Sequence, residues 1–419
     1  RTFQNGKTLP RLHQQGSRLP TRAIMKDTLT FEDATRLCGP RAFNLMIKPA
    51  GSLCNLDCHY CYYLDKSRIY GGQEPRMSLE MLETVIRNYI NANEVDEVCF
   101  NWHGGEPLLR PLSFYQHASR LQAYYSEGKS ILNCLQTNGL LLTEDWCRFL
   151  HDEGWLVGIS IDGTQAMHDT YRLSRGGEPT WEKVRKAIDL LDHYDVLWNA
   201  MATVHQGNVE QPFEFYRFFR DELSSNYLQF TPIVERIQLH KDGRTLAHLF
   251  DENCPIAPYS VHPDQWGHFL CTLFDEWSTH DVGNFFVQLF EATLAGWKGM
   301  SPGVCTFAED CGHAAVLEWN GDVYCCDHFV FPEFRLGNIL TDNLLTLLYG
   351  EKQEAFRRFK SESLPQQCQQ CEFLHVCHGE CPRLRFARTT DGEPGLHYLC
   401  TGYRAFFLHA APFMEAYEV

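Results

Sequence analysis

Three cysteines stand close together in the segment CNLDCHYC, residues 54–61, with gaps of three and two residues between them. Cys54, Cys58 and Cys61 can ligate three irons of a [4Fe–4S] cube, which normally takes one thiolate for each of its four irons. The fourth iron would then have no protein ligand and would be open to a reactant. A zinc site is the alternative interpretation, but zinc sites usually pair two CxxC motifs that are distant in sequence.

Nine further cysteines are concentrated between residues 305 and 400, and eight of them stand at spacings that suit metal ligands. The order is Cys305-x5-Cys311-x9-Gly321-x4-Cys326, then Cys368-x2-Cys371-x5-Cys377-x3-Cys381, and finally Cys400. Eight thiolates make two closed four-ligand sites. Two zinc ribbons would satisfy the same count, and only the three-cysteine segment upstream argues strongly against zinc.

The composition of the chain limits the classes of function. Its 419 residues are 44% hydrophobic and 21% charged, with a formal net charge of −16. This charge offers nucleic-acid phosphates and anionic membranes no broad basic face, so the expected partners are small molecules or peptides. No apolar run approaches the roughly 20 residues of a membrane span, and no secretory signal is evident. We therefore expect a cytoplasmic protein whose thiols bind metal rather than form a disulfide framework.

Short β-branched or aromatic runs alternate with helical patterns from about residue 42, which is typical of a parallel sheet built from β/α units. The expected strands are residues 43–48, 96–102, 131–136, 156–161, 196–204 and 227–234, and the expected helices are 78–92, 112–126, 143–153, 180–193 and 210–222. Six such steps predict an α/β fold with a partial (β/α)6 TIM-like barrel, because a complete barrel needs eight steps and roughly 250 residues. A partial barrel is open along one side and can admit a substrate larger than a metabolite.

The loops that follow these strands have unusual compositions, and in such folds the carboxyl ends of the strands hold the chemistry. CNLDCHYC follows the first expected strand, HGGEP (103–107) the second, QTNG (136–139) the third and SIDG (160–163) the fourth. These four loops should meet at one mouth of the barrel. In HGGEP, Gly104 and Gly105 permit close approach of the backbone to a ligand, although the segment is also compatible with an ordinary strand-to-helix turn.

The chain divides into five expected parts. They are an irregular N-terminal extension (1–40), the partial barrel (41–250), a helical connector (251–299) with helices near 263–280 and 284–298, a cysteine-rich module held together by metal (300–410) and a C-terminal tail (411–419). The extension starts at Arg1, upstream of Met25, and is not expected to belong to the fold.

The spacing CxxxCxxC, with the aromatic Tyr60 before its last cysteine, resembles the fingerprint of the radical S-adenosylmethionine (SAM) superfamily. The resemblance implies that SAM chelates the open iron and that its cleavage releases a 5′-deoxyadenosyl radical. It also implies that five residues contact SAM, namely Tyr60, Gly104, Gly105, Glu106 and Ser160. The Glu106 carboxylate is suited to the SAM ammonium. Taken alone, Tyr60 is also compatible with core packing and Ser160 with a turn or helix cap.

The cysteines of the C-terminal part resemble those of the SPASM domain, which extends radical SAM enzymes that modify peptides and proteins. By position, the resemblance assigns one auxiliary [4Fe–4S] cluster to Cys305, Cys311, Cys326 and Cys381, and a second to Cys368, Cys371, Cys377 and Cys400. Either Cys325 or Cys326 could be the cluster ligand, and the spacing Gly-x4-Cys from Gly321 selects Cys326. The implied cofactors are three [4Fe–4S] clusters and SAM.

Nearly the whole chain from residue 42 resembles the anaerobic sulfatase-maturating enzymes, in the segments NLMIKPAGSLCNLDCHYCYYL, WHGGEPLL, QTNGLLL, SIDG and GDVYCCDHFV. The resemblance implies an oxidoreductase that converts a Cys or Ser side chain of a sulfatase to Cα-formylglycine. It places the catalytic base at Asp327, directly after an auxiliary-cluster cysteine, where a base can act while the electron leaves toward a cluster. Taken alone, Asp327 is also compatible with a solvated turn residue.

The same resemblance implies a substrate cavity lined by Tyr63, Gln136 and Asn138, although QTNG is equally compatible with a turn. His103 departs from the pattern, since some members of the family have Gln at this position, and it is compatible either with a hydrogen bond to a substrate backbone or with a satisfied core histidine. The implied partners are a sulfatase polypeptide with the motif Cys/Ser-x-Pro-x-Arg and a small electron donor, either a flavodoxin or a ferredoxin. The sequence does not distinguish Cys from Ser as the target residue.

Two other functions stay open from the sequence. One is a different SPASM enzyme that installs a thioether, a crosslink or an epimerised residue in a peptide, but such enzymes often begin with a peptide-recognition domain that the short N-terminus does not resemble. The other is a non-catalytic binding protein stapled by metal. Anaerobic purification separates this last alternative, because three cubes give a brown protein with about twelve irons.

Overall fold

Residues 42–419 form one compact unit in the computed structural model of the protein. The expected parts at 41–250, 251–299 and 300–410 are therefore segments of a single fold. The structure describes residues 40–63, 66–70, 74–240, 243–248, 251 and 253–417, so the expected N-terminal extension lies almost entirely outside it. Within these ranges, no helix is long and apolar enough to cross a membrane.

A ten-stranded sheet is the centre of the fold, with the spatial order β12-β11-β10-β1-β2-β3-β4-β5-β6-β9. The six expected strands are β1 (Asn44–Lys48), β2 (Glu97–Trp102), β3 (Ser130–Thr137), β4 (Leu156–Ser160), β5 (Trp198–Val204) and β6 (Tyr227–Pro232). Neighbours among these six pair in parallel. The predicted α/β fold with six β/α steps is confirmed.

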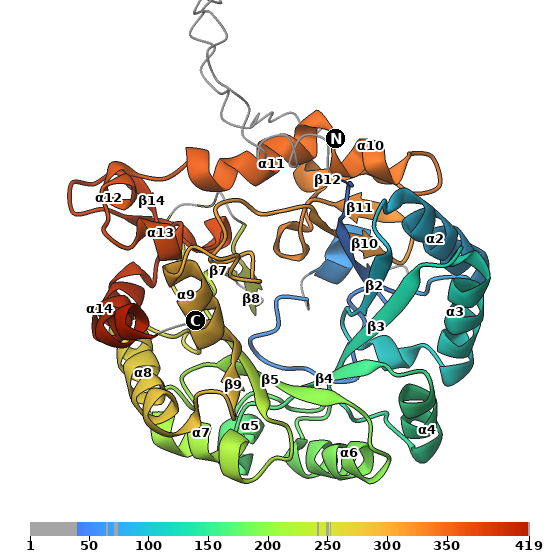
Figure 1. Ribbon diagram of the computed structural model, residues 1–419, viewed down its shortest axis with the longest axis horizontal. Coiled ribbons are helices and arrows are strands. Elements are labelled where there is room, and N and C mark those ends of the chain that lie inside the picture. The colour runs from blue at the N-terminus through green and yellow to red at the C-terminus, as the bar shows by residue number, and fades with distance from the viewer. Residues whose placement is uncertain are drawn as a thin grey trace, which may run out of the picture. The chain divides into compact units, whose positions relative to one another are not determined.

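The sheet extends beyond the six expected strands at both edges. β9 (Phe286–Val287) pairs in parallel with β6, and β10 (Ala314–Glu318) pairs in parallel with β1. β11 (Asp322–Tyr324) and β12 (Arg335–Asn338) continue the sheet antiparallel from β10. Figure 1 shows the orange strands of the cysteine-rich part beside the blue β1. Strands of the cysteine-rich part thus continue the barrel sheet.

Helices cover the outer face of the sheet because alternate strand residues are apolar on that side (Figure 1). Val98, Phe100 and Trp102 of β2 are buried there, and the ring of Trp102 stacks on Trp155 with centroids 6.2 Å apart. The helices that follow β1 to β5 are α2 (Leu79–Ala92), α3 (Leu112–Tyr125), α4 (Glu144–Asp152), α5 (Gln165–Asp169), α6 (Trp181–His193) and α7 (Pro212–Asp221). α2 begins after Ser78, whose hydroxyl accepts a hydrogen bond from the Met81 N–H as an N-cap.

The connector and the C-terminal part pack together through α8 (Pro263–Glu276) and α14 (Cys400–Ala416). Where these helices meet, a Cβ atom on Gly267 would lie 3.1 Å from the Cα of Gly402, so glycine permits the close approach. α14 includes residues 411–416 of the expected C-terminal tail. The other α-helices of the described residues are α9 (Gln288–Trp297), α10 (Leu344–Leu348), α11 (Glu351–Glu362), α12 (Gln366–Gln369) and α13 (Leu374–Cys377). One hairpin consists of β7 (Ile237–His240) and β8 (Gly243–Leu246), and another of β13 (Ala387–Arg388) and β14 (Pro394–Leu396).

Candidate active site

The three cysteines of CNLDCHYC lie in the loop that follows β1, as the sequence predicts. The Asp57 N–H holds this loop in place by donating to the Leu173 carbonyl oxygen at 2.9 Å. The thiols of Cys54, Cys58 and Cys61 lie close enough to influence one another electrostatically. Burial raises the pKa of Cys54 to about 12, with Glu106 and Cys61 adding to the shift. Buried thiols of this kind ionise only beside a cation, so this donor set fits a cluster held at three corners.

The two glycines of HGGEP lie against the backbone that leads into the cysteine loop. The Gly105 N–H donates to the Gly51 carbonyl oxygen, and the Glu106 N–H donates to that of Leu53, each at 2.8 Å. A Cβ atom on Gly105 would lie 2.2 Å from the Leu53 carbonyl oxygen, and one on Gly104 would lie 2.7 Å from that of Gly51. Packing of the chain on itself therefore requires both glycines, and their contact with SAM stays a prediction.

Glu106 is fully buried, and its carboxylate joins the loops that follow β2 and β3. Its oxygens accept hydrogen bonds from the Leu108 N–H at 2.9 Å, the Thr137 hydroxyl at 2.8 Å and the Asn138 N–H at 2.9 Å. Burial raises the pKa of Glu106 to about 7 despite these bonds. Asn138 Nδ2 donates in turn to Asn55 Oδ1 at 2.8 Å, within the cysteine loop. Glu106 thus positions two loops, and its predicted contact with the SAM ammonium would come in addition.

Gln136 and Ser160 lie side by side on β3 and β4. Gln136 Nε2 donates to Ser160 Oγ at 3.0 Å. A Cβ atom on Gly158 would lie 2.1 Å from Gln136 Oε1, so glycine at position 158 leaves room for the glutamine side chain. The structure therefore brings together one residue predicted to bind SAM and one predicted to bind substrate.

Tyr60 is fixed by a buried carboxylate, Asp162, that sequence reasoning missed. The Tyr60 hydroxyl donates to Asp162 Oδ2 at 2.5 Å. Asp162 also accepts hydrogen bonds from Arg172 Nε at 2.7 Å and from the Thr203 N–H at 2.8 Å. Burial opposes the ionisation of Asp162, but Arg172 holds its pKa well below its usual range. The available signal was its place in SIDG, two residues after Ser160.

Asp327 begins η4 (Asp327–Phe329), and several polar groups converge on its carboxylate. Oδ2 accepts hydrogen bonds from the hydroxyls of Tyr62 and, at 2.6 Å, of Tyr63, while Oδ1 contacts Lys48 Nζ. Lys66 Nζ lies 3.9 Å from Oδ1 and donates to the Asp327 carbonyl oxygen. Burial opposes the ionisation of Asp327, but Lys48 and Lys66 hold its pKa well below its usual range. We call these five residues the Asp327 cluster.

Sequence reasoning placed Asp327 and Tyr63 at the site but missed the two lysines and Tyr62. Lys48 is fully buried at the end of β1, and its Nζ also lies 3.3 Å from Glu318 Oε1, its register partner on β10. Lysine is almost never fully buried without a partner, so a lysine at the end of an apolar strand could have indicated a buried ion pair. The pairing of β1 with β10 is what brings Lys48 near Asp327.

The eight cysteines of the C-terminal part gather in the two predicted groups of four. The thiols of one group influence one another electrostatically, and so do those of the other; the first group is Cys305, Cys311, Cys326 and Cys381, and the second is Cys368, Cys371, Cys377 and Cys400. Burial raises the pKa of Cys326 and Cys377 to about 12, which again fits thiols that need a metal to ionise. Cys325 packs instead with Phe329 and Phe356 in an apolar cluster, which supports Cys326 as the ligand.

Arg385 binds the backbone segment that joins the two groups of four cysteines. Its guanidinium donates to four carbonyl oxygens, those of Lys360, His378, Gly379 and Glu380. Residues 378–380 are the segment between the two groups, since Cys377 belongs to one and Cys381 to the other. Thiols of both groups act electrostatically on this guanidinium. The charge of one partly buried cation can therefore stabilise two sites that become anionic when their thiols ionise.

We expect Arg385→Met to weaken iron binding at both auxiliary sites. The variant loses the hydrogen bonds that hold residues 378–380 and the positive charge that the two sites share. After anaerobic reconstitution, iron should fall from about twelve toward about four atoms per chain, measured by iron and sulfide assays. Arg388→Met is the matched control, because Arg388 donates to the Gly392 carbonyl oxygen in the β13–β14 turn. Full iron content in Arg385→Met would contradict this role.

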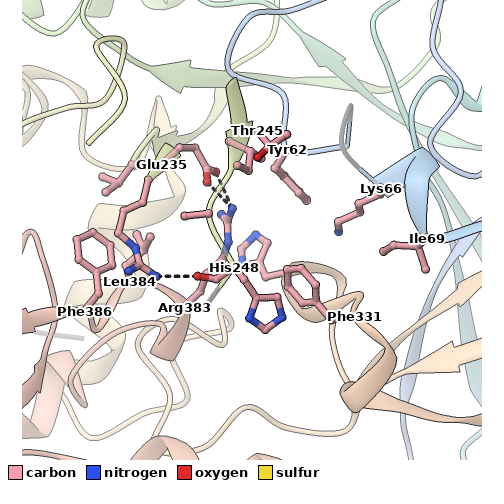
Figure 2. Close-up of a pocket in the computed structure, with 15 residues that line it drawn as sticks. Tyr62, Lys66, Ile69, Glu235, Thr245, His248, Phe331, Arg383, Leu384 and Phe386 are labelled. Atoms are coloured by element: carbon pink, nitrogen blue, oxygen red, sulfur yellow. Dashed lines mark hydrogen bonds and ion pairs between the residues drawn. The ribbon is translucent and has the colours of Figure 1, made fainter. Parts of the chain in front are cut away.

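A cavity of about 250 Å³ adjoins the Asp327 cluster. Tyr62 and Lys66 line it from the N-terminal half of the chain, and Phe331 lines it from the C-terminal half (Figure 2). Arg383 Nη2, also in the wall, donates to both carboxylate oxygens of Glu235 at 2.7 Å. Asp327 itself is not among the lining residues. A molecule in this cavity would therefore meet Lys66 and Tyr62 before it met the Asp327 carboxylate.

Two protein families match segments of the chain. Residues 49–219 match the radical SAM superfamily, and residues 305–372 match SPASM, an iron–sulfur cluster-binding domain. Both families had been expected from the cysteine spacings, and both expectations are confirmed.

Several named relatives cover most of the chain. The serine-type anaerobic sulfatase-maturating enzyme of Bacteroides thetaiotaomicron is 54% identical over 374 residues, which are 88% of this chain and 90% of the relative. The serine-type enzyme of Klebsiella aerogenes is 34% identical, covering 88% of this chain and 85% of the relative. The cysteine-type enzyme of Clostridium perfringens (strain 13 / Type A) is 32% identical, covering 88% and 96%.

Solved structures agree with these relatives. Native anSMEcpe with bound AdoMet and Cp18Cys peptide aligns with a TM-score of 0.78 at 30% identity, covering 90% of this chain and 98% of that chain. The same protein with bound AdoMet alone gives a TM-score of 0.78 and covers 89% of this chain and 98% of that chain. The chain belongs to the anaerobic sulfatase-maturating enzymes, radical SAM proteins with a C-terminal SPASM domain.

Proposed function

We propose that this protein is a serine-type maturating enzyme, which oxidises the side chain of Ser in a Ser-x-Pro-x-Arg segment of a sulfatase to Cα-formylglycine. The observation that carries the choice of serine is 54% identity to a serine-type relative, against 32% to a cysteine-type relative over the same share of the chain. The oxidation of a sulfatase side chain itself follows from the family. The cofactors are SAM and three [4Fe–4S] clusters.

The donor sets described above fit these cofactors. In our proposal Cys54, Cys58 and Cys61 hold the cluster that binds SAM, and the two groups of four cysteines hold the auxiliary clusters. When bound, SAM and its cluster supply the radical that removes a hydrogen atom from Cβ of the target residue. The proposed SAM contacts are Tyr60, Gly104, Gly105, Glu106 and Ser160, and the proposed substrate contacts are Tyr63, Gln136 and Asn138.

The chain's own side chains position these groups and handle the proton. Asp162 holds Tyr60, and Glu106 holds the loops after β2 and β3, so both keep the cysteine loop in place. Once Cβ has lost its hydrogen, the hydroxyl proton has to leave while the electron departs. Asp327 directly follows Cys326, a proposed ligand of an auxiliary cluster. In our proposal the proton and the electron therefore leave toward neighbouring residues of the SPASM part.

The remaining parts of the proposal concern location and partners. Residues 41–250 would generate the radical, 251–299 would connect, and 300–410 would hold the auxiliary clusters. Cys54, Cys58 and the eight proposed ligands of the auxiliary clusters form no disulfide, which supports a reducing compartment such as the cytoplasm. There a flavodoxin or a ferredoxin would supply the electron for SAM cleavage.

A pair of peptides that differ only in Ser or Cys at the target position tests this function. Each peptide is incubated anaerobically with reconstituted enzyme, SAM and dithionite, and the aldehyde is measured by mass spectrometry after capture with a hydrazide. We expect both peptides to gain a carbonyl, with Ser favoured by roughly tenfold or more. Equal or faster oxidation of Cys would contradict the serine assignment, and SAM cleavage without any aldehyde would contradict the proposed function.

A further inference from the structure

Two cysteines outside the site described above lie side by side on the inner face of the sheet. Cys99 of β2 and Cys134 of the neighbouring strand β3 (Figure 1) have their Sγ atoms 3.8 Å apart. Val98 and Phe100, the chain neighbours of Cys99, are buried on the outer face under the helices, and side chains alternate between the faces along a strand. Cys134 is on the same inner face as Cys99, because its register partner is Asn101. Neither cysteine is a proposed cluster ligand.

The backbone positions of this pair do not suit a disulfide. Cys99 is opposite Leu132, and Cys134 lies two residues further along β3. With about 4.8 Å between strands and about 3.3 Å for each residue, the Cα atoms of such a diagonal pair are about 8 Å apart. A disulfide needs a Cα separation below about 7 Å. The two sulfur atoms are therefore placed for an atom that bridges them rather than for a direct bond.

The separation of the two sulfur atoms matches one edge of a tetrahedral zinc site. Zinc–thiolate bonds are about 2.3 Å long, so two of them that span the 3.8 Å between the sulfur atoms meet at about 111°, close to the tetrahedral angle. Asn101 Oδ1 lies 3.8 Å from Cys99 Sγ, and a zinc–oxygen bond of about 2.1 Å gives an angle of about 119° between these two donors. Two edges of the tetrahedron are therefore already present.

The charges and the exposure around the pair suit a cation. The carboxylate of Glu97, on the same face of β2, acts electrostatically on Cys99. The hydrogen bond from Cys99 lowers the pKa of Cys134 to about 7, although burial opposes this shift, and the thiolate is the form that binds metal. Leu132, the register partner of Cys99, is 43% exposed, and Leu156, the register partner of Cys134, is 38% exposed. Water can therefore reach the pair and complete the coordination of a metal.

We propose that Cys99, Cys134 and Asn101 form a site for the thiophilic divalent cation Zn²⁺. The two thiolates and the amide oxygen supply three ligands, and water supplies the fourth. Both thiols release their protons to water when the metal binds, and no electron is transferred. The site joins β2 to β3 on the face that carries Gln136, two residues after Cys134. It goes beyond the proposed function and does not rest on it.

Zinc binding by the reconstituted protein tests the site. The protein with its clusters is treated with a chelator, incubated anaerobically with a slight excess of Zn²⁺ and desalted, and its zinc and iron are counted by atomic mass spectrometry. We expect about one zinc per chain in addition to about twelve irons. Zinc X-ray absorption should show two sulfur neighbours at about 2.3 Å together with oxygen neighbours. Four sulfur neighbours would place the zinc in a cysteine group of the SPASM part and would overturn the proposal, as would the absence of bound zinc.

Single substitutions identify the ligands. Cys99→Ala and Cys134→Ala should each lose the zinc and keep their iron, because one thiolate leaves too few ligands for a tetrahedral site. Asn101→Ala, which removes only the oxygen donor, should weaken zinc binding by roughly tenfold or more. Cys271→Ala, on α8, is the matched control and should bind zinc like the unaltered protein. Full zinc binding by either variant of the pair, or unchanged affinity in Asn101→Ala, would overturn the assigned ligand set.

Alkylation of the unaltered protein gives a measurement that does not depend on the folding of a variant. Bound zinc should slow the reaction of Cys99 and Cys134 with N-ethylmaleimide by roughly tenfold or more, as measured by mass spectrometry of the peptides. Cys147, fully buried on α4, should stay unreactive with and without zinc and so reports any general opening of the protein. Equal alkylation of the pair with and without zinc would also overturn the proposal.

Discussion

Cys58→Ala should abolish SAM cleavage while the two auxiliary groups of cysteines keep their iron. Cys58 is the central residue of the three-cysteine loop, and its thiol interacts electrostatically with Cys54 and Cys61. Two thiolates cannot hold a cube that already lacks a fourth ligand. The eight C-terminal cysteines interact within their own groups, so they should load independently. The expected iron content is about eight instead of about twelve atoms per chain, with 5′-deoxyadenosine at background.

The measurement combines an iron assay with chromatography of 5′-deoxyadenosine after incubation with SAM and dithionite. Cys271→Ala is the control, because Cys271 lies on α8 and packs against the hydrophobic core. SAM cleavage by Cys58→Ala would contradict the assignment of the three-cysteine loop. Loss of all iron from the variant would contradict the independent loading of the auxiliary sites.

Asp327→Asn should uncouple SAM cleavage from aldehyde formation. The substitution removes the anion that Lys48 and Lys66 share, and it places an amide where two tyrosine hydroxyls donate. With the cluster disrupted, the loss of aldehyde should approach the value of a general base, roughly 10²- to 10⁴-fold. SAM cleavage should persist, because Asp162 and Glu106 rather than Asp327 position the cysteine loop.

The test compares the amount of aldehyde with the amount of 5′-deoxyadenosine in each reaction. Asp342→Asn is a suitable control, since the Asp342 carboxylate accepts a hydrogen bond from the Asn338 N–H at an exposed turn. A parallel decrease of both products in Asp327→Asn would show that the residue is needed before hydrogen removal, and an unchanged ratio would remove Asp327 from the oxidation.

The six β/α steps could be predicted because each strand and helix has its own local pattern. In β2, for example, buried Val98, Phe100 and Trp102 alternate with more exposed residues. The extra strands have no such signal, since β9 has two residues and β11 has three, too few for a period to be detected. The pairing of β10 with β1 joins residues about 270 positions apart, and neither segment contains a sequence pattern that identifies the strand it pairs with.

The cysteine ligands could likewise be proposed, because their residue type and spacing are visible in short stretches of sequence, whereas their division into two groups came from the resemblance to the SPASM domain. The groups that surround Asp327 could not, because Lys48, Lys66 and Tyr62 reach it only after strands distant in sequence have paired. The glycines of HGGEP show a related limit. Their spacing suggested approach to a ligand, while the structure shows that the Leu53 carbonyl oxygen already occupies the space beside Gly105.

The place of β1 inside the sheet has a consequence for dividing this chain. Leu45 and Ile47 of β1 are fully buried, and the backbone of β1 pairs with β2 on one side and β10 on the other. A polypeptide that stopped before residue 314 would expose one side of β1 as a bare edge. Exposed edges of this kind recruit strands from other molecules and lead to aggregation. The strands before residue 314 and the strands after it therefore have to be parts of one polypeptide.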